Sequence, residues 1–281
     1  MSELSKKTWP APAKLNLLLR IVGRRADGYH LLQTVFQFVD LADQLSFNLR
    51  TDGVIKRVTP LEGVEEDQDL VVRAARLLQQ ESGTELGVEI KLDKQLPMGG
   101  GLGGGSSDAA TTLVALNALW DVGLSEDQLA KLGLKLGADV PVFIRGYAAW
   151  AEGVGETLTP IDLPEPWYLI LVPTCHVSTA EIFSDSALER NSPSITQNDF
   201  FLGHIGNNCL PVVSRRYPVV AHALEWLSHH AEARLTGTGG CVFAAFEDED
   251  EVQEVLRQVP AEYQGLVGRG LNRSPLFKGT K

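Results

Sequence analysis

The chain is short of cysteine and of long apolar runs, and each shortage argues against a class of protein. Its three cysteines, Cys175, Cys209 and Cys241, are widely spaced and form no C-x-x-C pair. Neither a disulfide framework nor a zinc site is therefore predicted, and a reducing compartment is favoured. No run of about 18 apolar residues occurs, and no apolar region follows Lys6 and Lys7, which argues against a spanning helix and a secretory signal. We expect a cytoplasmic protein with no membrane partner.

Positive charge is also scarce. Lys and Arg number 25 against 36 Asp and Glu, a net charge of −11, which argues against nucleic acid as the main ligand but leaves room for a small anion in one local site. The composition, 44% hydrophobic and 22% charged, is that of an ordinary globular protein. With 281 residues the chain can form one large domain or two medium ones. We place a boundary near residue 160, dividing the chain into 1–160 and 161–281, and the composition predicts no oligomeric state.

The first organised segment, residues 14–21, alternates between apolar and polar positions. Leu15, Leu17, Leu19 and Ile21 share one face, which predicts a strand. Lys14 and Asn16 would lie together on the opposite face, so both can point into one cavity. A loop over 24–30 follows, with Asp27-Gly28 as its turn.

The spacing of apolar residues, together with turn-forming and helix-capping residues, predicts the remaining elements. Residues 62–69 are acidic and indicate a solvated loop, 191–208 indicate irregular structure, and 235–240 form a second glycine turn. Helices are expected at 70–80, from Ser106 or Ser107 to Gly123, and at 125–137, 219–231 and 249–258. Strands are expected at 35–38, 44–49, 88–92, 167–173 and 241–246.

The most informative segment is the glycine loop, defined here as residues 97–107. It carries six glycines within positions 99–105, lies between a half-buried strand and a helix, and would be capped by Ser106 or Ser107. A flexible linker is one interpretation, but short connections to both elements favour an anion site, where backbone N–H groups and a helix N-terminus face a phosphate.

Two well-known phosphate motifs fit this loop poorly. Gly99, Gly101 and Gly104 satisfy G-x-G-x-x-G, but so many glycines satisfy almost any such pattern, and a second helix follows where a dinucleotide fold needs a parallel strand. No Lys-Ser or Lys-Thr completes a Walker A motif, and the H-R-D and D-F-G motifs of protein kinases are missing. A different phosphate-binding fold is required.

The segment Pro97-x-Gly-x-Gly-Leu-Gly-x-Gly-Ser-Ser-Asp-Ala-Ala resembles the ATP-binding signature of the GHMP kinases. Four further segments narrow the resemblance to the family that phosphorylates the 2-hydroxyl of 4-diphosphocytidyl-2-C-methyl-D-erythritol in the non-mevalonate isoprenoid pathway. They are Pro-Ala-Lys-Leu-Asn-Leu at 12–17, Arg-Ala-Asp-Gly-Tyr-His at 25–30, Gly-Ala-Asp-Val-Pro-Val-Phe at 137–143 and Leu-Thr-Gly-Thr-Gly at 235–239. The resemblance implies a two-domain α+β fold with the active site in the cleft between the domains.

The resemblance also implies roles for single residues. Asp139 would be the catalytic base and Lys14 would assist it, while Tyr29 and His30 would hold the cytosine, with Phe183 stacking on its other face. Asn16, Thr236 and Gly237 would also bind substrate. ATP would bind to Pro97, Met98, Gly99, Gly100, Gly101, Leu102, Gly103, Gly104, Gly105, Ser106 and Ser107. Relatives often have Asn-Leu-Val where this chain has Asp69-Leu70-Val71, near the expected adenine contacts.

The chemistry of these residues agrees with phosphoryl transfer, which needs alignment and neutralisation of charge. The Lys14 ammonium can stabilise a developing alkoxide and phosphate oxygens together, and Asp139 can accept the proton late in the transfer. No H-E-x-x-H or paired-carboxylate motif marks a protein metal site, so Mg²⁺ is expected to arrive with ATP.

Three alternatives stay open from the sequence. They are a nucleotide sensor that has lost catalysis, a nicotinamide-dependent oxidoreductase, and a mevalonate or homoserine kinase.

Overall fold

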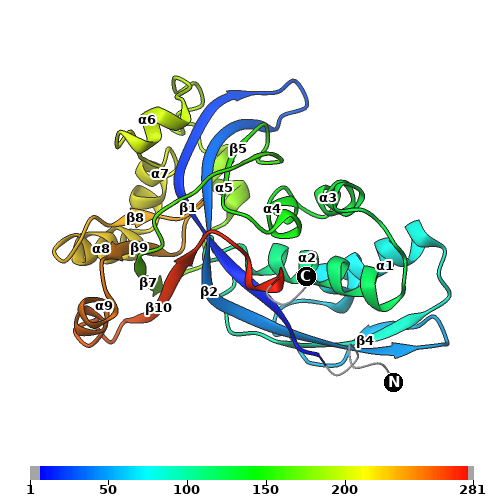
Figure 1. Cartoon of the computed structure of the whole chain (residues 1–281). Helices are drawn as coiled ribbons and strands as arrows, with labels where there is room; N and C mark the ends of the chain where they lie inside the picture. Colours follow the sequence, from blue (N-terminus) through cyan, green and yellow to red (C-terminus); the bar gives the residue numbers. More distant parts are fainter. Residues whose placement is uncertain (1–6, 278–281) are drawn as a thin grey trace.

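The computed structural model describes residues 7–277, and its first half is built on two long antiparallel strands (Figure 1). β1 (Trp9–Arg24) pairs with β2 (His30–Arg50), and the register places Lys14 opposite Phe38 and Asn16 opposite Phe36. The two separate strands expected at 35–38 and 44–49 are therefore wrong: one continuous strand spans both. The strand is continuous because β2 pairs with four other strands, β1, β4, β5 and β10. These neighbours also bury polar positions such as Gln37.

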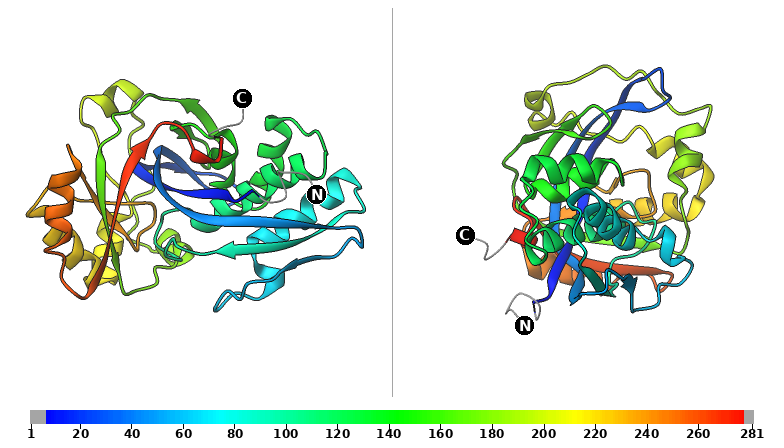
Figure 2. Two further views of the ribbon diagram at one scale, coloured as in Figure 1. Left: turned by 60° about the horizontal axis from the view of Figure 1, so that its bottom comes forward. Right: turned by 90° about the vertical axis from the view of Figure 1, so that its right-hand side faces the viewer.

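One mixed sheet runs through the molecule in the order β3-β4-β2-β10-β7-β9-β8, with β1 and β5 also pairing with β2 and β6 pairing with β5. Helices α1 to α4 lie together beside the sheet of the first half (Figures 1 and 2). The remaining elements of the first half are β3 (Ile55–Arg57), the 3-10 turn η2 (Glu66–Gln68), α1 (Leu70–Ser82), β4 (Gly87–Asp93), α2 (Gly104–Leu119), α3 (Glu126–Leu134), α4 (Val140–Arg145), β5 (Ala149–Glu152) and β6 (Thr157–Pro160).

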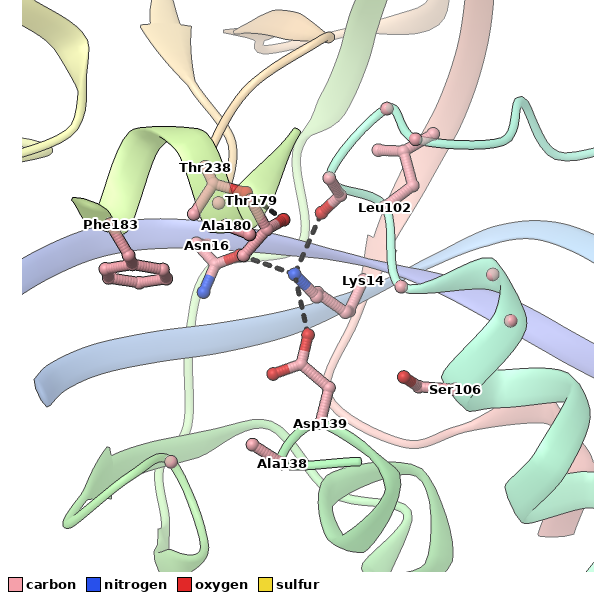
Figure 3. Close-up of a pocket in the computed structure, with 18 of the residues that line it drawn as sticks. Lys14, Asn16, Leu102, Ser106, Ala138, Asp139, Thr179, Ala180, Phe183 and Thr238 are labelled. Atoms are coloured by element: carbon pink, nitrogen blue, oxygen red, sulfur yellow. Dashed lines mark hydrogen bonds and ion pairs between the residues drawn. The ribbon is translucent and has the colours of Figure 1, made fainter. Parts of the chain in front are cut away.

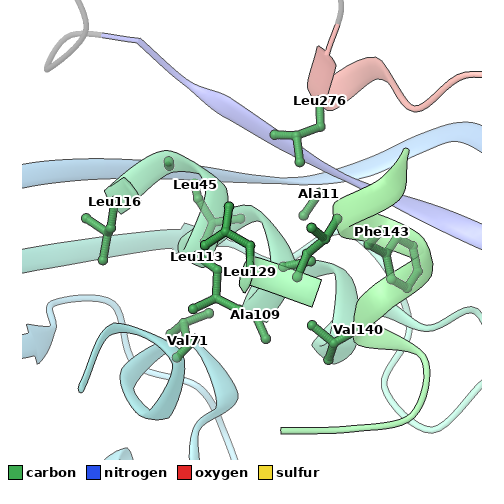
Figure 4. Packing of buried hydrophobic residues seen from close by; sticks show 14 of the residues in the cluster. Ala11, Leu45, Val71, Ala109, Leu113, Leu116, Leu129, Val140, Phe143 and Leu276 are labelled. Atoms are coloured by element: carbon green, nitrogen blue, oxygen red, sulfur yellow. The ribbon is translucent and has the colours of Figure 1, made fainter. Parts of the chain in front are cut away.

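The core of the first half explains why α2 is buried on several sides. Its residues Ala109, Leu113 and Leu116 are fully buried among side chains from β1, β2, α1, α3 and α4 (Figure 4). The polar residues Ser107, Asp108, Thr111 and Thr112 of the same helix are buried as well. α3 begins as expected, because Ser125 and Gln128 form a reciprocal capping box.

The second half packs helices against a smaller part of the sheet. Strand β7 has the predicted bounds, and α8, β9 and α9 agree closely with prediction, whereas α5, α6, α7 and β10 were not predicted. The elements are β7 (Trp167–Pro173), α5 (Thr179–Ser184), α6 (Gln197–Phe201), α7 (Leu210–Arg216), α8 (Pro218–Ser228), β8 (Arg234–Leu235), β9 (Val242–Phe246), α9 (Glu249–Leu256), β10 (Tyr263–Leu271) and η3 (Pro275–Phe277).

Strand β10 joins the two halves. It pairs along its length with β7 and places Gly270 and Leu271 against Val39 and Phe38 of β2. The chain then returns to the first half, where Leu276 of η3 enters the core (Figure 4). The boundary proposed near residue 160 falls at the end of β6 and stays a prediction. No helix in residues 7–277 is long and apolar enough to cross a membrane.

Candidate active site

A cavity of about 1030 Å³ lies where the two halves meet. Lys14 and Asn16 line it from β1, and Asp139 lines it from the start of α4 (Figure 3). The glycine loop borders the cavity on another side, and Thr179 and Phe183 of α5 border it from the second half. The cavity therefore collects most of the residues that the sequence assigned to function.

Lys14 lies on the cavity wall between Asn16, Asp139 and the glycine loop (Figure 3). Its side chain is 3% exposed, and its Nζ lies 2.6 Å from Oδ1 of Asn16, 2.8 Å from the carbonyl oxygen of Gly101 and 3.3 Å from Oδ2 of Asp139. Lys14 and Asn16 share a face of β1, as the alternation predicted. Asp139 is 35% exposed, so its carboxylate borders both the lysine and the open space.

The glycine loop is built from backbone conformations that favour glycine. Gly99, Gly101 and Gly103 have φ values of 73°, 79° and 74°. A Cβ at Gly101 would lie 2.5 Å from the carbonyl oxygen of Thr236, and one at Gly103 would lie 2.8 Å from Phe143 Cζ. The loop thus needs glycine for its conformation and for its close contacts with the second glycine turn and α4.

Helix α2 starts earlier than predicted. Its N-cap is Gly103 in the left-handed conformation, with no capping side chain, so the expectation that Ser106 or Ser107 caps the helix is wrong. The left-handed turn at Gly103 leads straight into the helix, which leaves both serines in its first turn. By helix geometry the N–H groups of Gly104, Gly105 and Ser106 lack intrahelical partners, whereas the Ser107 N–H donates to the Gly103 carbonyl oxygen at 2.8 Å. Gly104, Gly105 and Ser106 line the cavity, so these donors can face an anion.

Two predicted binding residues do not line the cavity. Ser107 and Thr236 are fully buried and lie outside the lining. Thr236 Oγ1 accepts a hydrogen bond of 3.0 Å from the Asn16 backbone N–H and lies 3.4 Å from the Gly101 carbonyl oxygen. The structure thus places Thr236 between β1 and the glycine loop, and its substrate contact stays a prediction. Gly237 and Thr238 of the same turn do line the cavity.

A buried charged cluster beneath the start of α2 was missed by sequence reasoning. Lys94 Nζ lies 2.5 Å from Asp43 Oδ2 and 2.7 Å from Asp108 Oδ2. Asp43 Oδ1 accepts the backbone N–H groups of Gln95 and Leu96 at 2.6 and 2.7 Å. These contacts tie together β2, α2 and the segment between β4 and the glycine loop. The only signal in the sequence was the Asp that follows the two serines of the motif.

Burial shapes the protonation of this cluster. The pKa of Asp108 is raised to about 7, chiefly by burial; the Lys94 charge opposes the rise and the Asp43 charge adds to it. Burial alone would lower the pKa of Lys94, but its two carboxylate partners raise it. Lys94 therefore remains a cation beside the cavity, and Asp108 changes charge near neutral pH.

At another end of the cavity lie the three residues expected to hold a cytosine. His30 and Phe183 are already stacked, with ring centroids 4.9 Å apart and an interplanar angle of 21°, while Tyr29 is 63% exposed. The expected arrangement, with the base between Tyr29 and Phe183, requires space that His30 partly occupies here. Burial, together with the charges of Arg190 and Arg24, lowers the pKa of His30, so its imidazole is neutral at physiological pH.

Asp69 corrects the picture of a solvated acidic loop. Its side chain is 5% exposed, caps α1 by accepting the Val71 N–H at 3.0 Å, and pairs with Arg57 Nε at 2.6 Å. Asp69 is therefore buried because it acts as the N-cap of α1 and forms an ion pair with Arg57 of β3. The acidic residues before it in the sequence gave no sign of either contact. Asp69 also lines the cavity.

Among residues 7–277 no group of three or more His, Cys, Asp or Glu side chains could hold a metal ion.

Comparison with protein families finds two separate family models that match this chain. Residues 69–147 match the model described as GHMP kinases N terminal domain, and residues 188–265 match GHMP kinases C terminal. The first match covers the glycine loop and Asp139, and the second covers the second glycine turn.

Whole-length relatives carry a more specific description. A protein of Pseudomonas paraeruginosa called 4-diphosphocytidyl-2-C-methyl-D-erythritol kinase is 59% identical over 269 residues, covering 96% of this chain and 95% of the relative. One of Nitrosococcus oceani with the same description is also 59% identical and covers 96% of each chain.

Solved structures agree in fold. A crystal structure of 4-(cytidine 5'-diphospho)-2C-methyl-D-erythritol kinase is similar with a TM-score of 0.82 and 31% identity, covering 94% of this chain and 99% of that one. A mevalonate kinase structure has a TM-score of 0.71 and 17% identity, covering 95% of this chain and 100% of that one. The latter likeness concerns the fold alone.

Proposed function

Because the chain belongs to the GHMP kinases, and within them to the 4-diphosphocytidyl-2-C-methyl-D-erythritol kinases, we propose that it transfers the γ-phosphoryl group of ATP to the 2-hydroxyl of that cytidine-linked polyol. The products are the 2-phosphate and ADP, and the reaction belongs to the non-mevalonate route to isoprenoid precursors. The observation that carries the proposal is the position of Lys14, whose ammonium lies between the Asp139 carboxylate and the glycine loop.

The N–H groups at the start of α2 support phosphate binding. Phosphoryl transfer spreads negative charge over the equatorial oxygens of the transferred group. The helix N-terminus supplies neutral donors and a partial positive charge to such oxygens, and Lys94 adds a nearby cation.

Lys14 and Asp139 support the transfer itself. Asp139 accepts the proton of the attacking hydroxyl late in the reaction, since a carboxylate is a far weaker base than an alkoxide. Lys14 stabilises both the developing alkoxide and the phosphate oxygens. The retained ion pair at 3.3 Å favours an enzyme over a nucleotide sensor without catalysis. The helix that follows α2 likewise argues against a nicotinamide-binding fold.

Mg²⁺ fits this donor set as an ion that arrives with ATP. Mg²⁺ is commonly bound by one or two carboxylates together with substrate phosphates, and Asp139 and Ser106 place a carboxylate and a hydroxyl on the cavity wall. When bound, the ion neutralises phosphate charge.

The free state of Cys175, Cys209 and Cys241 supports a reducing, cytoplasmic setting. The net charge of −11 supports a small-molecule partner over nucleic acid.

An ADP-release assay tests the proposal, with the cytidine-linked substrate, mevalonate and homoserine offered side by side. We expect turnover of the cytidine-linked substrate alone. His30→Ala should raise KM for that substrate, leave KM for ATP little changed and reduce the preference for cytosine over uracil. Turnover of mevalonate or homoserine in its place would refute the assignment.

A further inference from the structure

Arg190 lies behind the base end of the cavity and is not part of its lining. Its guanidinium donates to three carbonyl oxygens, those of Leu188 at 3.0 Å, Phe183 at 2.9 Å and Asp185 at 2.7 Å. Its Nε–H donates to Nε2 of His30 at 3.2 Å. One side chain thus connects the start of β2 with the end of α5 and the segment that follows it.

The bond to His30 determines where the imidazole carries its proton. A guanidinium is always protonated and has no acceptor atom, so Nε2 of His30 must accept. A neutral imidazole that accepts at Nε2 carries its hydrogen on Nδ1. The charges of Arg190 and Arg24 also lower the pKa of His30, in addition to burial. Protonation at Nε2 would place an N–H group against the Nε–H donor of Arg190. The hydrogen bond and the nearby positive charges therefore both favour the neutral imidazole with its hydrogen on Nδ1.

We infer that Arg190 is a positioning residue for base recognition: it holds His30 in the Nδ1–H tautomer and orients that donor toward the cavity. The two nitrogens of an imidazole point in widely different directions, so a ring whose Nε2 faces Arg190 directs Nδ1–H away from it. A single N–H donor matches an unprotonated ring nitrogen, as at N3 of cytosine, and opposes the N3–H of uracil. The inference rests on the proposed function for the identity of the base.

The same arginine supports the other aromatic wall. Its bond to the carbonyl oxygen of Phe183 fixes the backbone that carries the ring stacked on His30. The next acidic residue, Asp185, is held by Arg215 and Arg216 at 2.8 and 2.7 Å, so the segment is anchored on both sides. A hydrogen-bond donor and a stacking surface are therefore preorganised by one residue outside the cavity.

The first experiment needs no substrate. ¹⁵N-edited NMR of the imidazoles reports the tautomer and pKa of His30 in the full-length protein. We expect the Nδ1–H form in the wild type, and in Arg190→Ala a shift toward the Nε2–H form with a higher pKa. An unchanged tautomer in Arg190→Ala would overturn the inference. If Arg190→Ala does not fold, Arg190→Lys gives the same comparison, because an ammonium cannot reproduce the fork of donors.

Kinetics provide the second readout. Arg190→Ala should raise KM for the cytidine-linked substrate roughly 5- to 50-fold, with kcat and KM for ATP within about twofold. The matched control is Arg20→Ala, because Arg20 also ties β1 to a loop carbonyl, that of Pro193 at 3.1 and 2.9 Å, without contacting His30. It should leave KM for the cytidine-linked substrate unchanged.

A double variant separates positioning from support of the fold. In a His30→Ala background the additional substitution of Arg190 should raise KM by a smaller factor than it does in the wild type, because only its support of the Phe183 backbone is then left to lose. An equal further loss would overturn the inference. The proposed function fails separately, if the wild type does not turn over the cytidine-linked substrate even though NMR shows the expected tautomer.

Discussion

Gly103→Ala tests how closely the glycine loop, Lys14 and α4 depend on one another. Gly103 has a φ of 74°. An added Cβ would lie 2.8 Å from Phe143 Cζ and 3.0 and 3.1 Å from Cε and Cγ of Lys14. Phe143 is 1% exposed and has little room to move. The methyl group therefore presses directly on the side-chain stem of Lys14.

The cost has two parts. The left-handed conformation costs roughly 1–2 kcal/mol for a residue with a Cβ, and overpacking a buried site costs about 1–3 kcal/mol more. We expect unfolding free energy to fall by about 2–5 kcal/mol. Because Lys14 Nζ lies at 2.6–3.3 Å from its three partners, displacement of its stem should also lower kcat by roughly 10- to 100-fold.

Gly123→Ala is the matched control. Gly123 has a φ of 77°, and an added Cβ would meet nothing within 4 Å. The Gly123→Ala variant should lose only the conformational part of the unfolding free energy, about 1–2 kcal/mol, and should leave kcat unchanged. Urea unfolding and ADP release measured on both variants separate the two contributions. Equal stability losses, with wild-type kcat in Gly103→Ala, would refute the argument from contact with Phe143 and Lys14.

Three further perturbations examine other parts of the site and fold. Asp139→Asn should lower kcat by roughly 10²- to 10⁴-fold with nearly unchanged ATP affinity by calorimetry, and wild-type kcat would remove Asp139 from the mechanism. The pKa of Asp108 is raised to about 7 when folded, so the folded state binds more protons than the unfolded state above about pH 4. Stability should therefore fall as pH rises toward 7, by at most about 1.4 kcal/mol per unit. Asp108→Asn should abolish this slope in urea midpoints, and parallel profiles would contradict it. Tyr168→Phe leaves Gln37 Oε1, now 2.6 Å from the Tyr168 hydroxyl, without its partner, and should cost about 1–3 kcal/mol in urea unfolding; a smaller loss would mean that Gln37 finds another donor.

Local sequence predicted many of the regular elements and most of the residues that line the cavity. Strand β7 and helices α1, α3 and α9 follow from apolar periodicity and capping residues, which act within one turn or one strand. The glycine loop was recognisable because an anion site needs residues without side chains, whose backbone N–H groups are accessible, next to the start of a helix. Lys14 and Asn16 could be assigned to one face because strands alternate with a period of two.

Tertiary structure alone decided the features that depend on distant partners. Strand β10 carries Gly265, Gly268 and Gly270 and gave no strand signal, and it is held by pairing with β7 and β2. Asp43 and Lys94 are 51 positions apart, so their cluster with Asp108 has no local pattern. The same holds for Arg190, whose contact with His30 spans 160 positions. Periodicity reports the solvent side of an element, whereas buried polar contacts arise only when the packed chain removes water and the groups must find partners in each other.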